Sequence, residues 1–412
     1  MINHATPGST FRLPTDPEAR LLHTIRTLTA TSRSELAATL DYSQPTIARY
    51  TAKLVERGII TSDLGQSSSA APKQHTLPHH SKRGRPEQTL RMADKPIAAA
   101  AAYIGVNSTT ITAANFSGHP LATKTIRMVL RHHSPEEALE AIAHETRSLI
   151  RKLRPSHPQL LTSIPMGLAF TAPVNSDGTV TSSAYGWHNV APQRIMTPLL
   201  NTHVSVANGV HAMAARELFS RQLPSSTSSS PNDHHASLYF YARDLIGHSW
   251  IIGSQVPLPR DNSFNRTLEL ILPSHHIDQW KKSGLHPLGN RSLIHQAQSV
   301  GYSVSDTHEL IKAAQRHPEL RALLDNRAQN LGSLLVIAAE TLGPDSIVLA
   351  GDVFTRDPRT IEIVRTALSS ALPGASDPIR IEQAHPRIMA ESAAVVALAD
   401  LWARSELLHE LL

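Results

Sequence analysis

The spacing of hydrophobic residues divides the chain into a helical first part and a mixed remainder. Between residues 17 and 60 apolar side chains recur at intervals of three and four, as at Leu21, Ile25 and Leu28, which predicts short amphipathic helices. From residue 95 onward, short β-type runs alternate with longer helical patterns. We expect strands at 98–106, 109–116, 164–170 and 346–349, and helices at 135–152, 208–221 and 327–342. Such alternation indicates an α/β body with at least partly parallel sheets.

Three segments show no periodic pattern. Residues 1–16 are polar and contain proline, and we expect a flexible lead-in there. Residues 67–86 are rich in Ser, Ala, Pro and His, which is typical of a loop or linker. Residues 224–235 contain a run of serines, which predicts a disordered surface insertion. Because 412 residues exceed what one hydrophobic core usually holds, we expect two or three domains.

Residues 32–50 have the pattern of a helix-turn-helix. A short amphipathic helix ends near Leu40, and a tight turn follows it. Ser43 is then placed to cap the N-terminus of a second helix, and Pro45 is tolerated in the first turn of that helix. In a DNA-binding protein the early positions of this second helix meet base edges in the major groove.

The second helix is predicted to expose several polar residues opposite its apolar face. Gln44 is suited to adenine and Arg49 to guanine, whereas Thr46 and Lys53 are better suited to phosphate or methyl contacts. The expected DNA contacts in this helix are Ser43, Gln44, Pro45, Thr46, Arg49 and Lys53.

A wing follows the second helix in the predicted order. Gly58 ends the helix, and strands are expected to begin at 59–61 and to return at 88–92. We therefore predict a winged helix-turn-helix domain at 17–92, with a long wing and linker at 61–90. An ordinary helical hairpin is the alternative, but the capping serine, the spacing and the wing strand agree on DNA binding.

The charge of the chain lies in its first part. Residues 1–95 contain thirteen Lys or Arg and eight Asp or Glu, a net +5, which equals the net +5 of the whole chain and leaves zero for the remainder. A basic unit on a neutral body fits a polyanionic partner for that unit. Arg83 and Arg85, beside Gly84 and Pro86, are either an arm for a narrow minor groove or a solvated basic linker.

The composition excludes several classes of protein. The chain has no cysteine, which rules out disulfides, thiolate catalysis and cysteine-ligated metal sites. It has no apolar run of about 18 residues and no secretion signal at its start, so we expect a cytoplasmic protein without a membrane partner. The 24 histidines include adjacent pairs, which rarely face one metal, and we expect no metal site, although a histidine-only site remains open.

Four segments carry a resemblance to a known family. They lie at 84–92, 167–190, 206–217 and 342–351. Each motif is weak by itself, and the order and spacing of the four carry the resemblance. Together they resemble the ROK family (repressors, open reading frames and sugar kinases), in its transcription-regulator branch. The match extends from about residue 17 to the C-terminus and is poor over 220–320.

The resemblance implies an architecture and a set of partners. The fold would be a winged helix-turn-helix followed by a two-lobed, actin-like (ribonuclease-H-like) α/β body. Lobe 1 would span 96–205, with a C-terminal helix near 388–412 packing back on it, and lobe 2 would span 206–387. The implied partners are a near-palindromic operator in double-stranded DNA, further copies of the chain in a dimer or tetramer, and a small metabolite such as a sugar.

The parts of the family that perform sugar phosphorylation are missing. Where the family's kinases have a catalytic aspartate, this chain has Gly209, which has no side chain to accept a proton. The stretch that would be the phosphate turn, 104–110, has no aspartate and a single glycine. The family's zinc site needs three cysteines. We therefore predict no catalytic residue, no cofactor and no enzymatic activity.

Three residues on the matched segments are candidates for binding an effector: Asn189, Asn208 and His211. For Asn208, a role as the N-cap of a helix is an equal alternative. Two other functions stay open at this point: a divergent sugar kinase, and a regulatory interaction protein that binds no ligand.

Overall fold

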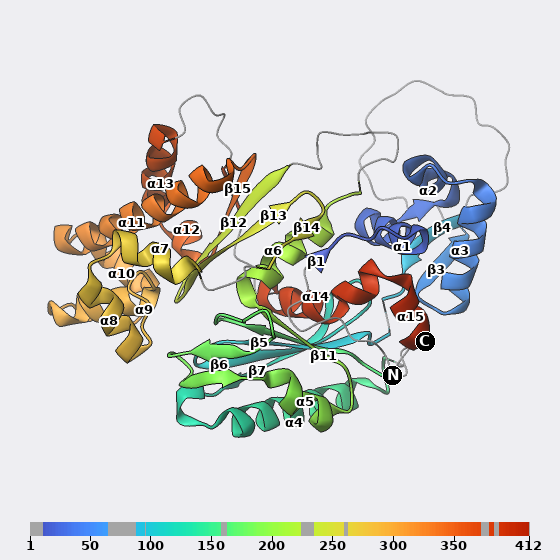
Figure 1. The fold of residues 1–412 in the computed structure, drawn as a ribbon, viewed down its shortest axis with the longest axis horizontal. Helices are drawn as coiled ribbons and strands as arrows, with labels where there is room; N and C mark the ends of the chain where they lie inside the picture. Colours follow the sequence, from blue (N-terminus) through green and yellow to red (C-terminus); the bar gives the residue numbers. More distant parts are fainter. Residues whose placement is uncertain are drawn as a thin grey trace.

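The computed structural model describes residues 11–64, 88–94, 96–157, 163–223, 235–258, 263–371, 379–382 and 387–411. Figure 1 shows a small winged-helix domain beside two α/β lobes, with helix α14 (Ile388–Ala403) between the lobes. No helix in the described ranges is long and apolar enough to cross a membrane.

The winged-helix domain has the predicted order of elements. Its helices are α1 (Pro17–Leu28), α2 (Arg33–Leu40) and α3 (Gln44–Glu56), and its sheet has the strand order β2 (Thr31–Ser32), β4 (Gln88–Met92), β3 (Ile60–Leu64). Asp41 adopts a left-handed conformation (φ 56°) in the turn between α2 and α3, and the side chain of Ser43 accepts a hydrogen bond from the Thr46 amide at 3.4 Å. The expected wing strands and the capping serine are thus confirmed. The segment 65–87, with Arg83 and Arg85, lies outside the described residues.

Lobe 1 is built on a five-stranded sheet. Its strand order is β11 (Val204–Asn208), β8 (Met166–Phe170), β5 (Ala99–Ile104), β6 (Ser108–Ala114), β7 (Pro120–Arg127). The pairs β11–β8 and β8–β5 are parallel and the other two are antiparallel. The sheet therefore ends at Asn208, beyond the lobe boundary that we expected at 205. Helices α4 (Pro135–Leu153) and α5 (Pro192–Leu200) cover one face of the sheet, and a hairpin of β9 (Val180–Ser182) and β10 (Trp187–Val190) lies beside it.

Helix α14 covers the other face of this sheet, against β5 and β8 (Figure 1). Small residues allow the close approach: β5 begins with four alanines, and α14 is rich in alanine. A Cβ atom on Gly167 of β8 would lie 2.5 Å from the backbone nitrogen of Ala397. The helix and the sheet are therefore in backbone contact, which only a glycine at this position allows.

Lobe 2 is built on a six-stranded sheet. Its strand order is β1 (Phe11–Arg12), β14 (Gln255–Val256), β13 (Ile246–Ile252), β12 (Ala236–Ala242), β15 (Ser346–Ala350), β16 (Ile379–Ile381). One side carries α11 (Pro318–Leu342), α12 (Asp352–Arg356) and α13 (Pro358–Ala371). Four shorter helices extend this lobe: α7 (Ser263–Ile271), α8 (Ser274–Ser283), α9 (Asn290–Ser299) and α10 (Thr307–Ala314). Helix α6 (Gly209–Ser220) lies between this sheet and α14.

The start of the chain differs from the expected flexible lead-in. Strand β1 pairs antiparallel with β14, Phe11 and Leu13 are buried, and the Leu13 amide donates to the Ser254 carbonyl at 2.9 Å. Asp16 then caps α1 by accepting from the Ala19 amide at 2.9 Å. The expectation is therefore wrong for residues 11–16, because two apolar residues in alternation are too short a pattern to reveal an edge strand. Residues 1–10, and residues 224–234 of the insertion predicted at 224–235, lie outside the described residues.

A continuous hydrophobic core joins the winged-helix domain to the body. Leu21 and Ile25 of α1 belong to the same buried cluster as Phe219 of α6 and Trp402 of α14, and the cluster reaches Leu408 in the terminal helix α15 (Ser405–Leu411). The domain is therefore held firmly against the lobes.

Candidate nucleic-acid interface and ligand cavity

Helix α3 turns one face to solvent. Gln44, Pro45, Ala48 and Arg49 are exposed, whereas Ile47, Thr51 and Leu54 are buried against the rest of the domain. The Arg49 guanidinium lies 4.9 Å from the centre of the Tyr50 ring. Thr46 is half-buried, and its hydroxyl lies 2.9 Å from the hydroxyl of Ser43. The structure thus brings five of the six expected contacts together in the first two turns of α3.

Lys53 is the exception among the expected DNA contacts. Its ammonium lies 3.4 Å from the Glu18 carboxylate in α1 and 2.7 Å from the His409 ring in α15. Arg57 also contacts His409. The C-terminal part of α3 is therefore fastened to the body, a contact that sequence spacing could not reveal because α15 lies at the other end of the chain.

A second contact fastens α1 to the C-terminal end of α6. Arg26 donates to the Phe219 carbonyl at 2.6 Å and to the His23 ring at 3.0 Å, and its guanidinium lies 4.1 Å from the Trp402 ring centre. The other ring nitrogen of His23 lies 2.8 Å from the Arg221 carbonyl. Burial lowers the pKa of Arg26 to about 9, which leaves the guanidinium charged at neutral pH. Burial, and then the charge of Arg26, lower the pKa of His23 to about 3, so this imidazole is neutral.

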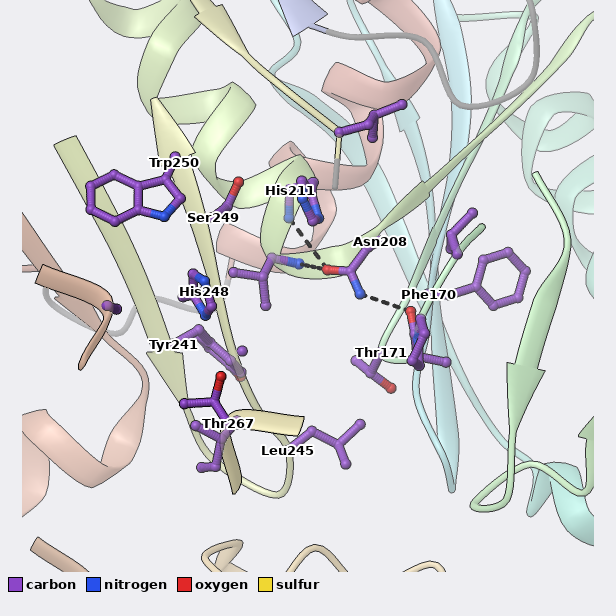
Figure 2. Close-up of a pocket in the computed structure, with 18 of the residues that line it drawn as sticks. Phe170, Thr171, Asn208, His211, Tyr241, Leu245, His248, Ser249, Trp250 and Thr267 are labelled. Atoms are coloured by element: carbon purple, nitrogen blue, oxygen red, sulfur yellow. Dashed lines mark hydrogen bonds between the residues drawn. The ribbon is translucent and has the colours of Figure 1, made fainter. Parts of the chain in front are cut away.

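A cavity of about 490 Å³ lies between the lobes, at the N-terminal end of α6. Figure 2 shows His248, Ser249 and Trp250 of β13 on one side of Asn208 and His211, and Phe170 and Thr171 on the other. The structure therefore brings two of the three expected effector residues, Asn208 and His211, into one cavity.

Asn208 caps the N-terminus of α6, which was the alternative to a role in binding an effector. Its side-chain oxygen accepts from the Val210 amide at 2.8 Å and from the His211 amide at 3.4 Å. Its side-chain nitrogen donates to the Ala172 carbonyl at 2.8 Å (Figure 2). The same amide also lines the cavity, so the capping role does not remove it from the site.

Asn189, the third expected effector residue, does not join this group. It is exposed in β10, outside the cavity lining, and has a left-handed backbone (φ 51°) where the pairing of β9 and β10 is irregular. Asparagine adopts this conformation more readily than most residues. The geometry gives Asn189 a backbone role in the hairpin.

Three histidines in the cavity lining are held neutral. Burial lowers the pKa of His211 and of His248 to about 4 and the pKa of His286 to about 3. For His211 the nearby His248 adds to the effect of burial. Within the described ranges, no group of three or more His, Asp or Glu side chains is placed to hold a metal ion.

The space beside Gly209 is occupied by another side chain. A Cβ atom on Gly209 would lie 2.4 Å from the hydroxyl oxygen of Tyr103, which comes from β5. An aspartate at 209 therefore has no room in this packing. The turn at 105–108, between β5 and β6, is a tight one in which the Gly105 amide donates to the Ser108 carbonyl at 2.9 Å.

Comparison with known proteins places this geometry in context. No protein-family model matches the sequence. Proteins named as transcriptional regulators in Mycobacterium tuberculosis and Mycobacterium bovis are 25% identical over 398 residues, which cover 93% of this chain and 85% of each relative. A crystal structure described as a ROK family transcriptional regulator, a homologue of the E. coli MLC protein, superposes with a TM-score of 0.64 at 15% identity, over 94% of this chain and 98% of that one.

The chain has the ROK fold. A ROK hexokinase from Thermus thermophilus matches with a TM-score of 0.55 at 19% identity, over 74% of this chain and 98% of that one. A ROK family protein from Streptococcus pneumoniae, solved in complex with sucrose, matches with a TM-score of 0.53 at 15% identity, over 75% of this chain and 99% of that one. The fold predicted from the four sequence segments is confirmed.

Sequence analysis did not predict the residues that lobe 2 contributes to the cavity. Trp250, Trp280 and His286 line the cavity, and all three fall in the region 220–320, where the resemblance is poor. Their only sequence signal is the presence of large aromatic residues in a chain in which 4% of residues are aromatic.

Proposed function

We propose that this ROK-fold protein is a transcriptional regulator that binds double-stranded DNA through α3 and responds to a small molecule bound between its lobes. Its relatives across 93% of the chain carry the name of transcriptional regulators. The observation that carries the proposal is the exposed face of α3, with Gln44 and Arg49 at the positions that meet base edges in a major-groove docking. Arg83 and Arg85 remain proposed minor-groove contacts.

The proposed regulator acts in the cytoplasm as a homodimer or tetramer on a near-palindromic operator. A single recognition helix reads only one half-site, and paired helices give two half-sites with a fixed spacing. The fastening of Lys53 and Arg57 to His409 supports this idea, because a recognition helix held rigidly to the body can transmit the geometry of an oligomer to DNA.

Helix α6 supports the coupling of ligand to DNA. Asn208 and His211 at its N-terminal end line the cavity, while Phe219 and Arg221 at its C-terminal end accept hydrogen bonds from Arg26 and His23 of the winged-helix domain. A ligand that binds more tightly when α6 has one placement than when it has another raises the population of that placement. Because α1 is bonded to the C-terminal end of α6, α1 moves with it.

Sugar phosphorylation is not part of the proposed function. Gly209 has no proton acceptor, and Tyr103 occupies the space that an aspartate would need. None of the described residues around the cavity carries a carboxylate. ATP hydrolysis measured with hexoses should stay at the background rate of buffer alone.

The DNA-binding proposal is tested with the full-length protein and its operator, identified by genomic footprinting. Arg49→Ala should weaken operator binding by about tenfold or more, because a bidentate arginine–guanine contact is worth roughly 1–3 kcal/mol. Binding to random DNA of the same length should fall much less. Arg151→Ala, which removes the same charge from the exposed surface of α4, is the matched control and should leave both affinities unchanged.

Fluorescence anisotropy at several salt concentrations measures both affinities. Equal losses on both DNAs would reduce Arg49 to a phosphate contact. Absence of salt-dependent DNA binding by the full chain would refute the proposed function, because phosphate neutralisation always releases counterions.

A further inference from the structure

We propose that the inter-lobe cavity binds an uncharged, largely apolar ring compound that carries one or two hydrogen-bonding groups, and that it rejects sugars and anions. The inference concerns the ligand class of the site in the proposed function, and it rests on that function only for the ligand's role as an effector. Three observations carry it: the hydrogen bonds already made around the cavity, the charges around it, and its aromatic lining.

The polar side chains on the lobe 1 side of the cavity are already bonded to protein. Thr171 bonds to the Ile104 carbonyl at 3.2 Å and to the Tyr185 hydroxyl at 2.9 Å. Asn175 donates to the Thr179 hydroxyl at 2.8 Å, and Asn208 makes the three bonds given above. These bonds use part of the hydrogen-bonding capacity of the wall, and they leave the carbonyl oxygen of Asn175 and one N–H of each asparagine for a ligand.

A sugar needs the opposite situation. Each pyranose hydroxyl that leaves water requires a new partner, since burying an unpaired hydroxyl costs about 1–3 kcal/mol on the scale of protein substitutions. Sites that satisfy several hydroxyls at once need many unpaired donors and acceptors. The wall of Thr171, Asn175 and Asn208 provides fewer donors and acceptors than several hydroxyls need, because some are already bonded to protein.

A small number of polar atoms around the cavity do lack a partner. Nδ1 of His211, the hydroxyl of Ser249 and Nε2 of His286 are buried and make no hydrogen bond with a described residue. The tautomer of His286 is set, because the Leu288 amide donates to its Nδ1 at 3.2 Å and the proton must then reside on Nε2. Nε2 of His286 is therefore a fixed donor, buried beneath the surface of the cavity.

The charges around the cavity argue against an anion. Among its described lining residues none is Asp, Glu, Lys or Arg. The histidines give no positive charge at neutral pH, because burial keeps the pKa of His211 at about 4 and that of His286 at about 3. A phosphate or carboxylate would therefore enter a buried site without a compensating cation, which is costly.

The remaining lining is apolar and aromatic. Trp250 and Trp280 contribute rings, and Leu245, Ile337 and Leu334 contribute aliphatic surface. The volume of about 490 Å³ lies within the usual range of small-molecule sites, roughly 300–1,000 Å³. A ring compound fills such a space through apolar contact, which needs no further polar partners.

The test uses two fluorescent probes with the same ring skeleton and different charge. N-phenyl-1-naphthylamine is neutral, and 8-anilino-1-naphthalenesulfonate adds one sulfonate to it. Each is titrated into the full-length protein at pH 7.5, with emission measured by energy transfer from tryptophan, since Trp250 and Trp280 line the site. The Kd of the neutral probe should be lower than that of the sulfonate by about tenfold or more. Glucose, N-acetylglucosamine and glucose 6-phosphate at about 10 mM should not displace it.

A blocking variant shows which signal comes from the cavity. Ile337→Trp fills the cavity from α11, and Ser333→Trp places the same side chain on the exposed surface of that helix. Ile337→Trp should weaken the affinity for the neutral probe roughly tenfold, which removes about four-fifths of the binding at a fixed concentration near the original Kd. Ser333→Trp should leave it unchanged. If Ile337→Trp fails to fold by circular dichroism, Thr341→Trp, an exposed position that also lines the cavity, takes its place.

Three results would overturn the ligand class: equal or tighter binding of the sulfonate in the component that Ile337→Trp removes, displacement by a sugar, or neutral-probe binding that survives the blocking variants. Operator affinity is measured in the same samples. Cavity binding of the neutral probe without effect on operator affinity supports the ligand class and removes the effector role. Loss of DNA binding in every sample, with cavity binding retained, refutes the proposed function and leaves the ligand class standing.

Discussion

A buried histidine lies at each end of helix α6, and the two differ in their hydrogen-bond partners. At the C-terminal end, His23 of α1 bonds through one ring nitrogen to the Arg221 carbonyl and through the other to Arg26. At the N-terminal end, Nδ1 of His211 finds no partner among the described residues. Burial lowers the pKa of both, to about 3 for His23 and about 4 for His211.

The comparison shows that burial and a lowered pKa do not identify a ligand site. Both properties follow from desolvation, which acts in the same way on a structural contact and on a binding site. The hydrogen-bond partners separate the two cases, because an unpaired buried atom is a cost that a ligand can remove. His23 has a protein partner on each ring nitrogen, whereas the buried Nδ1 of His211 has none among the described residues.

Lowering the pH should destabilise the contacts at both ends of α6, and we expect it to change the free energy of unfolding more than the substitutions below. His23, His211, His248 and His286 have folded-state pKa values of about 3 to 4, below the unfolded value of 6.5. The unfolded chain then binds more protons between these values, so the stability is present above pH 6.5 and is lost as the pH falls. Between pH 7 and 5.5 we expect a loss of roughly 1 kcal/mol per histidine, or about 4 kcal/mol in all.

Urea unfolding followed by circular dichroism at pH 7.0, 6.0 and 5.5 measures this loss. A free energy of unfolding that stays constant over the range would mean that these histidines bind protons equally in the folded and unfolded protein, which would remove the common ground of the comparison.

Removing Arg26 should be the next largest effect. Arg26→Ala leaves the Phe219 carbonyl and one nitrogen of His23 without their donor and removes the stacking on Trp402. We expect about 3 kcal/mol of destabilisation, from the acceptors left without a donor and the lost contact with the Trp402 ring. Arg49→Ala, in the same domain but on its exposed face, should change the stability by less than about 0.5 kcal/mol. Similar melting temperatures for both variants would show that the contact at the C-terminal end of α6 contributes little.

A matched pair of histidine substitutions tests the comparison directly with the smallest effects. His23→Leu should cost about 2 kcal/mol, because it leaves the Arg221 carbonyl and one donor of Arg26 unpaired. His211→Leu has similar bulk but removes an atom that had no partner, so its effect should lie within about 0.5 kcal/mol of zero or be stabilising. Equal destabilisation by the two, in the same denaturation experiment at pH 7.5, would mean that the free ligand site is as well satisfied as the domain contact.

The sequence was sufficient for features that depend on local pattern. Strands β5, β6 and β8 and helix α4 of lobe 1, the capping Ser43 and the wing strand at 88–92 follow from spacing and capping within a few residues, and they are found as expected. The ROK fold followed from the order of four short motifs, although each of them is weak alone.

The features that escaped prediction all join distant parts of the chain. Lys53 looks solvent-exposed on a helical wheel, yet it meets His409 of the terminal helix. Tyr103 blocks the space beside Gly209 from another strand, and Trp280 reaches the cavity from a region with no recognisable motif. Such contacts are set by tertiary packing, which a single sequence does not encode in its local periodicity.

The pairing of β1 with β14 gives the winged-helix domain two attachment points on two different bodies. The chain leaves the lobe 2 sheet at Arg12, passes through the domain, and enters the lobe 1 sheet at Ala99 (Figure 1). The domain therefore connects the two lobes. A change in the angle between the lobes would alter the distance between Arg12 and Ala99.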